Sequence, residues 1–241
     1  MLKIDLHTHS NFSDGHDSLD EILKIAIEFD VEKLAITDHM SAFGHFLFSN
    51  VKPAKSIERY LEEITRFRQK YGDNIEIYTG AEISSDFHSG KLTQQQEDRL
   101  QDNLEYFSLF LIETYVIQEP ILTALNLRKY LTQQGFDATP VILAHPRYSS
   151  MSFETFRLLL NNHIGFELNE DKLSAREASF FLNHINSLTP QEKNKLTLSL
   201  GSDSHHKEEV GIVPFTSLVI EENNLSKYVI TPPKAHDKFG V

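Results

Sequence analysis

The chain contains no cysteine, which excludes disulfide bonds and thiolate metal sites. It also contains no run of about 18 apolar residues, so we expect no membrane-spanning helix. The first residues, Met1–Asp5, lack the apolar stretch and the small-residue cleavage site of a signal peptide. These absences predict a protein of the cytoplasm whose metal ligands, where present, are nitrogen and oxygen atoms.

The sequence has no run of basic residues either. Its 23 Lys and Arg residues are scattered and are outnumbered by 35 Asp and Glu residues, which gives a formal net charge of −12. Such a chain repels polyanions, so we do not expect a dedicated nucleic-acid binder, and a nucleotide or oligonucleotide enters only as a small substrate. Bound divalent cations would offset part of the negative charge locally.

Short β-rich runs alternate with helical patterns along the 241 residues. Most of these runs are almost continuously apolar, as expected of parallel strands that are covered on both faces. The predicted strands are Leu2–Leu6, Lys33–Thr37, Ile75–Thr79, Tyr106–Ile112, Val141–Ala144, Ile164–Leu168 and Leu196–Leu200.

The segments between these strands carry helix signals. Ser18–Glu21 is a capping box, and apolar residues at helical spacing follow it. Ile57–Phe67 has the apolar stripe of a helix that is buried on one side. Pro120 and Gly135 show the Pro-first, Gly-last placement of a helix. Two further capping boxes are predicted at Ser174–Glu177 and Thr189–Glu192.

Strand–helix alternation repeated seven times predicts one α/β domain over residues 1–241, with a parallel sheet closed or nearly closed as a TIM-like barrel. An open doubly wound sheet is the alternative. The Gln-rich stretch 91–103 is predicted to be a surface helix. The stretch 226–241, which contains Thr231–Pro233, is predicted to be an extended, weakly packed tail.

Six of the twelve histidines lie just beyond the strand-like runs, a placement not expected of solvated surface histidines. Carboxylates occupy similar places. The candidate metal ligands are His7, His9, Asp14, His39, Glu82, His145, Asp203 and His205. Because the sites of α/β barrels are built at the carboxyl ends of the strands, we expect these side chains to meet over the barrel mouth.

The types of these side chains indicate the ion and the chemistry. Imidazole nitrogens together with carboxylate oxygens suit Zn²⁺, Mn²⁺ or Fe. His7 and His9 share one face of an extended segment, so both can approach one ion. Eight ligands are too many for one ion, and we expect two or three, with Glu82 as a bridge. A metal-bound water that loses its proton near neutral pH would then attack a phosphate ester in line.

Other polar residues at the strand ends receive supporting roles. Asp38 is expected to assist catalysis by orienting a neighbouring ligand, or else to cap a helix. Arg147 is expected to clamp the substrate phosphate, with a surface ion pair as the alternative. His206 is a candidate substrate contact. Glu167 and Asn169 end the sixth strand and are expected to orient ligands or substrate.

Five short motifs resemble those of the PHP (polymerase and histidinol phosphatase) superfamily. They are His7–Gly15, Thr37–His39, Gly80–Ile83, Ala144–Pro146 and Gly201–His205. The resemblance extends over positions 7 to 205, nearly the whole chain. It implies a distorted (β/α)7 barrel with a trinuclear metal centre that hydrolyses phosphomonoesters or phosphodiesters.

The resemblance also implies how the ligands are divided among the ions. One ion would be held by His7, His9, Glu82 and Asp203, a second by Asp14, His39 and His205, and a third by Glu82 and His145. Members of the superfamily usually supply another histidine near the end of the fourth strand, where this chain reads Tyr106–Glu113 without one. Glu113 and His88 are the candidate replacements, and two ions are better supported than three.

These features predict a metal-dependent phosphoesterase that acts on a small phosphorylated metabolite, either histidinol phosphate-like or nucleotide-like. Two alternatives stay open. One is hydrolysis of a carbon–nitrogen or carboxylic ester bond, because related barrels share this metal cup. The other is a non-catalytic metal-binding module, which the missing histidine motivates. The phenylalanine-rich loop Met40–Lys52 is expected either to contact the substrate or to form a buried plug.

Overall fold

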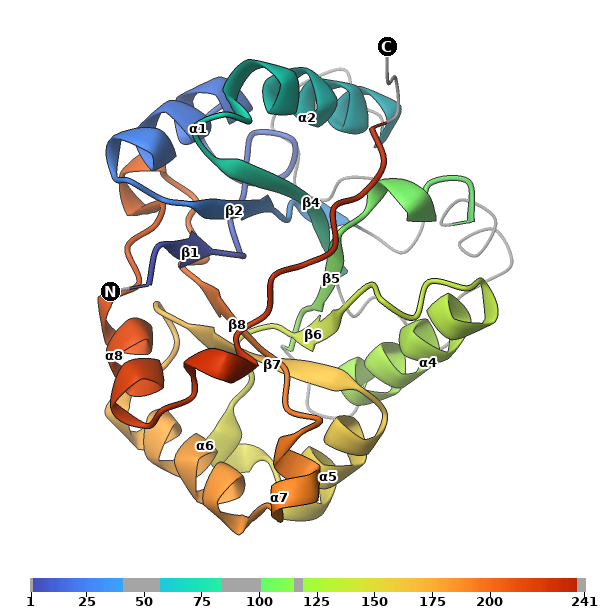
Figure 1. Ribbon diagram of the computed structural model, residues 1–241, viewed down its shortest axis with the longest axis vertical. Coiled ribbons are helices and arrows are strands. Elements are labelled where there is room, and N and C mark those ends of the chain that lie inside the picture. The colour runs from blue at the N-terminus through green and yellow to red at the C-terminus, as the bar shows by residue number, and fades with distance from the viewer. Residues whose placement is uncertain (1, 41–56, 84–100, 115–118, 238–241) are drawn as a thin grey trace.

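A parallel sheet surrounded by helices forms the body of the protein (Figure 1). The computed structural model describes residues 2–40, 57–83, 101–114 and 119–237. Its strands are β1 (Ile4–Asp5), β2 (Lys33–Ile36), β3 (His39–Met40), β4 (Glu76–Ile83), β5 (Leu109–Ile112), β6 (Val141–Leu143), β7 (Ile164–Asn169) and β8 (Leu198–Gly201). Its α-helices are α1 (Leu19–Glu28), α2 (Ile57–Tyr71), α4 (Glu119–Gln133), α5 (Phe153–Asn161), α6 (Ala175–Ser187), α7 (Pro190–Lys193) and α8 (Pro214–Glu222).

The sheet runs in the order β1-β2-β4-β5-β6-β7-β8, and every neighbouring pair is parallel. The short β3 pairs with the end of β4. The two edges of the sheet also meet, since Leu6 N–H donates to Leu200 O at 2.8 Å and Asp203 N–H donates to His7 O at 3.0 Å. The predicted nearly closed barrel is therefore confirmed, and the open doubly wound sheet is wrong.

The predicted strand bounds change most around β4. This strand continues to Ile83, beyond the predicted end at Thr79, so Glu82 lies within the strand. The extension occurs because Glu82 pairs with His39 of β3 on one side and with Leu111 of β5 on the other. The next strand begins later than predicted, because a single 3-10 turn (Leu104–Tyr106) precedes it.

Apolar side chains fill two layers, one inside the barrel and one between the strands and the helices. Along β5 the side chains alternate, with Leu109 and Leu111 inside the barrel and Phe110 and Ile112 packed outside it. The inner layer consists of Leu6, Ala35, Tyr78, Leu109, Leu111, Ile142 and Ala144. A barrel filled in this way is a packed core and not a pore, so the polar groups are confined to its ends.

The predicted helix signals mostly act as expected. Glu21 accepts the Ser18 N–H at 3.0 Å to begin α1, and Glu192 accepts the Thr189 N–H at 2.9 Å to begin α7. Gly135 has a φ of +83° just after α4, where a residue without a Cβ is favoured. At Ser174 only half of the predicted capping box forms, because the carboxylate of Glu177 bonds Ser149 instead.

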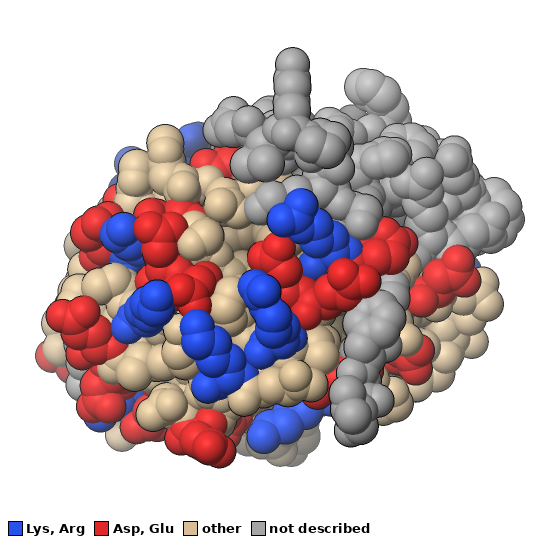
Figure 2. All heavy atoms as spheres, turned by 90° about the horizontal axis from the view of Figure 1, so that it is seen from above, with Lys and Arg blue, Asp and Glu red and all other residues tan. Residues whose placement is uncertain are grey.

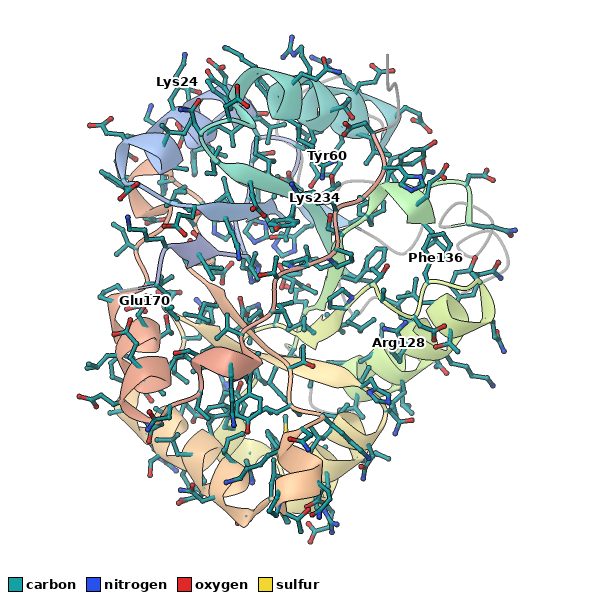
Figure 3. All side chains as sticks on the ribbon, in the orientation of Figure 1. Lys24, Tyr60, Arg128, Phe136, Glu170 and Lys234 are labelled. Atoms are coloured by element: carbon teal, nitrogen blue, oxygen red, sulfur yellow. The ribbon has the colours of Figure 1, made fainter. Side chains whose placement is uncertain are left out.

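After a single 3-10 turn (Ser226–Tyr228), the C-terminal segment runs across the amino end of the barrel. Ile230 N–H donates to Leu198 O at 2.9 Å, and its side chain packs against the inner apolar layer. Thr231 accepts a hydrogen bond from Lys33 at 2.7 Å. Figures 1 and 3 show this segment, which carries Lys234, crossing the barrel in front of the strands. Through Ile230 the segment thus covers apolar surface at the open amino end of the barrel.

Acidic and basic side chains are interspersed on the face that carries α1 and α2 (Figure 2). Lys24 and Lys70 both pair with Asp20, at 2.6 and 2.8 Å. Inside the same region, the hydroxyl of Tyr60 points from α2 towards the sheet (Figure 3) and lies 2.8 Å from Ile36 O. None of the described helices is both long and apolar enough to span a membrane.

Three sequence predictions lie outside the described residues. They are the phenylalanine-rich loop beyond Met40, the histidine at position 88, and most of the surface helix predicted at 91–103.

Candidate metal centre

All eight predicted ligands lie at the carboxyl end of the barrel. His7 and His9 follow β1, and His145 follows β6. His39 and Glu82 face each other across the β3–β4 pair, and the remaining ligands come from the loops after β1 and β8. The structure gathers most of these ligands into two adjoining clusters.

The first cluster contains His7, His9, Glu82 and Asp203, with one ligand atom from each lying within 4.8 Å of all the others. His7 Nε2 lies 3.0 Å from His9 Nε2 and 3.2 Å from Glu82 Oε2. His9 Nε2 lies 3.1 Å from Asp203 Oδ1. Three of the four side chains are completely buried, and Asp203 is 9% exposed. Four nitrogen and oxygen donors converging on one point suit a divalent ion.

The second cluster contains His9, Asp14, His39 and His205. Asp14 Oδ2 lies 3.2 Å from His205 Nε2 and 3.5 Å from His39 Nε2. His9 belongs to both clusters, since its Nδ1 lies 3.7 Å from Asp14 Oδ1. Among the described residues this buried Nδ1 has no hydrogen-bond partner, which fits an atom that a metal ion would satisfy.

Glu82 lies between the two clusters and the position beside His145 that was predicted for a third ion. Its Oε2 lies 3.2 Å from both His7 Nε2 and His39 Nδ1, while its Oε1 lies 3.0 Å from His145 Nε2. In the described part of the chain, no third histidine or acid joins Glu82 and His145 to make a group of three. Glu113 is buried at the end of β5, but it is not a member of such a group.

Burial disfavours the charged forms of the side chains in this centre, but acids and histidines that lie next to each other stabilise each other's charge. Burial lowers the pKa of His7, yet the carboxylates of Glu167, Glu82 and Asp203 together raise it well above its ordinary value. The hydrogen bond with Asp14 raises the pKa of His205 to about 9. Burial alone would raise the pKa of Asp14, but its histidine neighbours lower it to about 2. Protons on His7 and His205 thus balance charge that bound cations would otherwise balance.

Asp38 lies beneath the ligands and supports the loop that carries Asp14. Its Oδ1 accepts the N–H groups of Ser10 and Ser13 at 2.8 and 3.1 Å, and both serine hydroxyls donate to its carboxylate at 2.6 Å. The side chain is fully buried, and burial raises the pKa of Asp38 to about 6 despite these four donors. Asp38 thus supports the loop that carries Asp14. The sequence had predicted that it would orient a ligand side chain directly.

Asp5 supports the loop of another ligand in the same way as Asp38, a role that the sequence did not predict. It accepts hydrogen bonds from Ser202 N–H at 3.0 Å, from the Ser202 hydroxyl at 2.7 Å and from Gly211 N–H at 2.8 Å. These bonds hold the loop that carries Asp203. The available signal was a lone acid in an apolar strand, two residues before His7, since alternate strand residues share a face.

Arg147 and His206, the predicted substrate contacts, follow β6 and β8 and line separate pockets. Arg147 is exposed on the loop after His145 and lines a pocket of about 190 Å³ with apolar residues such as Ile121 and Met151. His206 is exposed and stacks on His16 with ring centroids 4.2 Å apart. It lines a pocket of about 410 Å³ whose other residues are Glu170, Asp171, Ser202, Asp203, His205, Glu209 and Ile212.

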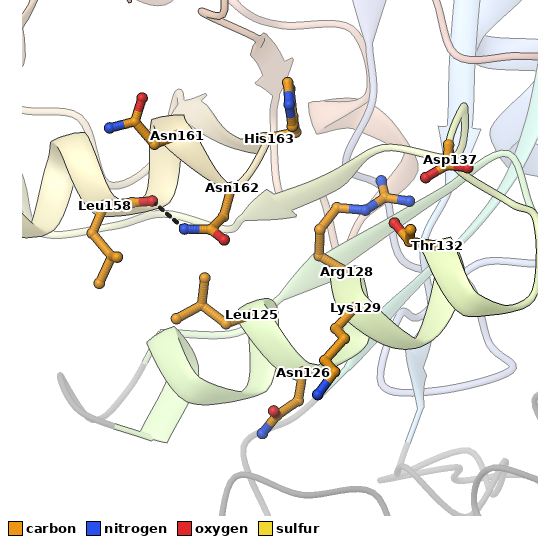
Figure 4. Close-up of a pocket in the computed structure, with 10 residues that line it drawn as sticks. All are labelled: Leu125, Asn126, Arg128, Lys129, Thr132, Asp137, Leu158, Asn161, Asn162 and His163. Carbon is orange, nitrogen blue, oxygen red and sulfur yellow. Dashed lines mark hydrogen bonds between the residues drawn. The ribbon is translucent and has the colours of Figure 1, made fainter.

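A larger hollow of about 710 Å³ lies elsewhere, between α4 and the end of α5 (Figure 4). Arg128 and Asp137 line it, and Arg128 also donates to Thr139 O at 2.7 Å. His163, at its edge, immediately precedes β7. The hollow is therefore at the amino end of the barrel, away from the metal ligands.

Known structures share this fold. A histidinol phosphate phosphatase from Lactococcus lactis subsp. lactis, complexed with zinc, L-histidinol and phosphate, has a TM-score of 0.61 and 17% identity, covering 97% of this chain and 98% of that chain. A Listeria monocytogenes protein, provisionally assigned as a histidinol phosphatase, has a TM-score of 0.58 and 15% identity, covering 89% and 99%. At these identities the likeness shows the fold.

Sequence comparisons identify the family. The α subunit of DNA polymerase III from Borreliella burgdorferi is 32% identical over 78 residues, which is 29% of this chain and only 7% of that protein. The model of the PHP domain family matches residues 5–188, well over half of the chain. This match shows that the chain belongs to the PHP domain family.

Proposed function

We propose that the chain hydrolyses the phosphate monoester of a small, positively charged alcohol, using zinc, manganese or iron ions at the two clusters. The observation that carries this proposal is the convergence of His7, His9, Glu82 and Asp203 beside His9, Asp14, His39 and His205. Bound divalent ions supply an activated water and neutralise charge on the attacking and leaving oxygens of an in-line displacement.

The protein side chains determine where the substrate approaches. In the first cluster no side chain is more than 9% exposed, whereas the side chains of Asp14 and His205 in the second are 28% and 35% exposed. A phosphate group therefore reaches the centre over His205. His206 follows directly and lines the adjoining pocket, so it is placed to contact the alcohol portion of the substrate.

The adjoining pocket favours a cationic leaving group over a nucleotide. Its lining includes the carboxylates of Glu170, Asp171 and Glu209. Glu170 accepts the N–H groups that begin α8 (Figure 3), and Glu209 accepts those of His205 and His206. Both acids are thereby held in place, and Asp171, which is exposed beside them, pairs with Lys172. Such a surface attracts an ammonium or imidazolium group and repels a second phosphate.

Substrate competition tests this proposal. Metal-loaded protein should hydrolyse histidinol phosphate and other amino-alcohol phosphates with a lower KM than p-nitrophenyl phosphate or AMP. Asp171→Asn, which also frees Lys172, should raise KM for the amino-alcohol phosphates several-fold relative to KM for p-nitrophenyl phosphate, because only the former carry a positive charge. A preference for AMP, or no turnover with any of the three metals, would overturn the proposal.

We also propose that Arg147 contacts the substrate phosphate from the His145 side. Its guanidinium is exposed on the loop that leaves the barrel mouth, where a bidentate phosphate contact is accessible. Arg147→Ala should lower kcat/KM for every phosphate ester by about tenfold, the size of one charged hydrogen-bond contact. Unchanged kinetics would leave Arg147 as a surface residue.

A further inference from the structure

Glu167 is a buried carboxylate that touches two metal-ligand residues at once. It lies in β7, is 1% exposed, and points into the carboxyl end of the barrel. Its Oε1 lies 2.8 Å from His7 Nδ1, and its Oε2 accepts the backbone N–H of His145 at 2.6 Å. The side-chain N–H of Asn169 donates a hydrogen bond to the same Oε2 at 3.3 Å.

The contact with His7 determines which ring nitrogen is free to bind a metal. A carboxylate oxygen only accepts hydrogen bonds, so His7 Nδ1 must carry the proton in this pair. When the ring is neutral, the lone pair then lies on Nε2. That atom is the one that faces His9 and Glu82 in the first cluster. A second hydrogen bond of this kind fixes both the tautomer and the orientation of a ligating histidine.

The contact with His145 stabilises an unfavourable backbone conformation at that residue. His145 has a φ of +34°, a region that residues with a side chain seldom occupy. The 2.6 Å bond from its N–H to Glu167 holds this conformation, and the ring then lies with Nε2 3.0 Å from Glu82 Oε1. The same carboxylate therefore orients donors on both sides of Glu82.

Gly201 gives independent evidence that the chain leaves room for this arrangement. A Cβ built on Gly201 would lie 2.3 Å from Glu167 Oε1 and 2.3 Å from His7 Cβ. Any side chain at this position in β8 would therefore displace the Glu167–His7 pair. The strand carries a glycine where the pair needs the space.

We propose that Glu167 is a positioning residue that sets the donor atoms of His7 and His145, and so links metal loading at the first cluster to the Glu82–His145 position. This role of Glu167 concerns metal binding and is independent of the substrate proposed above. Loss of such an outer hydrogen-bond partner typically weakens metal affinity by about 10- to 100-fold.

The test uses Glu167→Gln, which keeps the shape of the side chain but replaces one acceptor by an N–H donor. If the Gln oxygen keeps the His145 bond, its amide group faces His7 Nδ1 and favours the other tautomer. We expect zinc affinity to fall about 10- to 100-fold by competition with a chelator. We also expect the His145 amide proton, held by a short bond in the wild type, to move upfield in NMR spectra. In cadmium-substituted protein with nitrogen-labelled histidine, the coupling of cadmium to His7 Nε2 should weaken or vanish.

Two further variants separate positioning from general destabilisation. Gly201→Ala should cause a similar loss of zinc affinity although the charge of Glu167 is retained, and Glu177→Gln, a matched change near Ser149, should leave affinity unchanged. The metal-free Glu167→Gln protein should still unfold in one cooperative transition, at a temperature well above that of the zinc titration. Wild-type zinc affinity in Glu167→Gln, or an unchanged His145 amide, would overturn the proposal. If Glu167→Gln lost metal only under conditions where it also unfolds, that result would overturn the proposal as well.

Discussion

The two ligand clusters share His9 but differ in how deeply their side chains are buried. The first is almost completely buried, with only Asp203 reaching a surface pocket, and its carboxylates lie directly against histidine rings. The second includes Asp14 and His205, which are partly exposed on loops. Under the proposed function, the buried cluster would anchor a tightly held ion and the open cluster would meet the substrate. The predictions below test this contrast, beginning with the largest expected effect.

His9→Ala should abolish the contrast, because it removes a ligand from both clusters at once. We expect neither cluster to retain its ion through purification and kcat/KM to fall about 10³-fold or more, which corresponds to about 4 kcal/mol of lost transition-state stabilisation. Elemental analysis and phosphatase kinetics measure the two effects. His236→Ala, on the exposed C-terminal segment, is the matched control. Retention of a full metal complement would show that His9 is not shared.

Asp14→Ala should separate the two clusters. It removes a ligand from the open cluster only, so we expect one ion per chain to be retained and kcat/KM to fall about 10²-fold, as for loss of one electrostatic contact to the reacting group. Asp203→Ala should lower the metal content further, because its partners are buried and cannot be satisfied by water. If the two variants lost the same ions, the proposed division would fail.

The open cluster should also respond to pH. The pKa of His205 is raised to about 9 from 6.5 by Asp14, so its protonated form stabilises the metal-free fold. That stabilisation is complete below about pH 6.5 and is lost as the pH rises through about 9. The melting temperature of metal-free protein should therefore fall over this range. Affinity for an ion at the open cluster should rise about tenfold per pH unit up to about pH 9, because the proton leaves.

His205→Gln provides the comparison for the pH experiment. Its melting temperature without metal should change less between pH 6.5 and 9 than that of the wild type. A wild-type profile that the substitution leaves unaltered would assign the pH dependence to another group.

Asp38→Asn should give the smallest effect and should spare the buried cluster. The amide would place a donor against the donors of Ser10 and Ser13 and so loosen the loop that carries Asp14. The loss of about 1 kcal/mol for one reversed hydrogen bond corresponds to roughly fivefold weaker binding of the second ion. Metal titration that showed equal weakening at both clusters would contradict the specific role of Asp38.

Much of the site could be predicted because its signals are local. His7 and His9 are two residues apart in an extended segment, and this spacing alone places them on one face. Glu82 illustrates the limit of such reasoning. It was recognised as a ligand and a candidate bridge, but its place inside β4 depends on pairing with β3 and β5 at once. The contacts of Asp5 and the packing of Ile230 at the amino end of the barrel are likewise absent from any local pattern.

By itself, the sequence determined the parallel strands, the helix starts and the chemical types of the metal ligands, since each depends on residues close together in the chain. Only the tertiary structure decided that His9 serves two clusters, that one cluster is buried while the other is open, and that Glu167 touches both His7 and His145. The reason is the closure of the barrel. Hydrogen bonds such as Asp203 N–H to His7 O join segments almost two hundred residues apart, and no local pattern specifies which side chains then face each other.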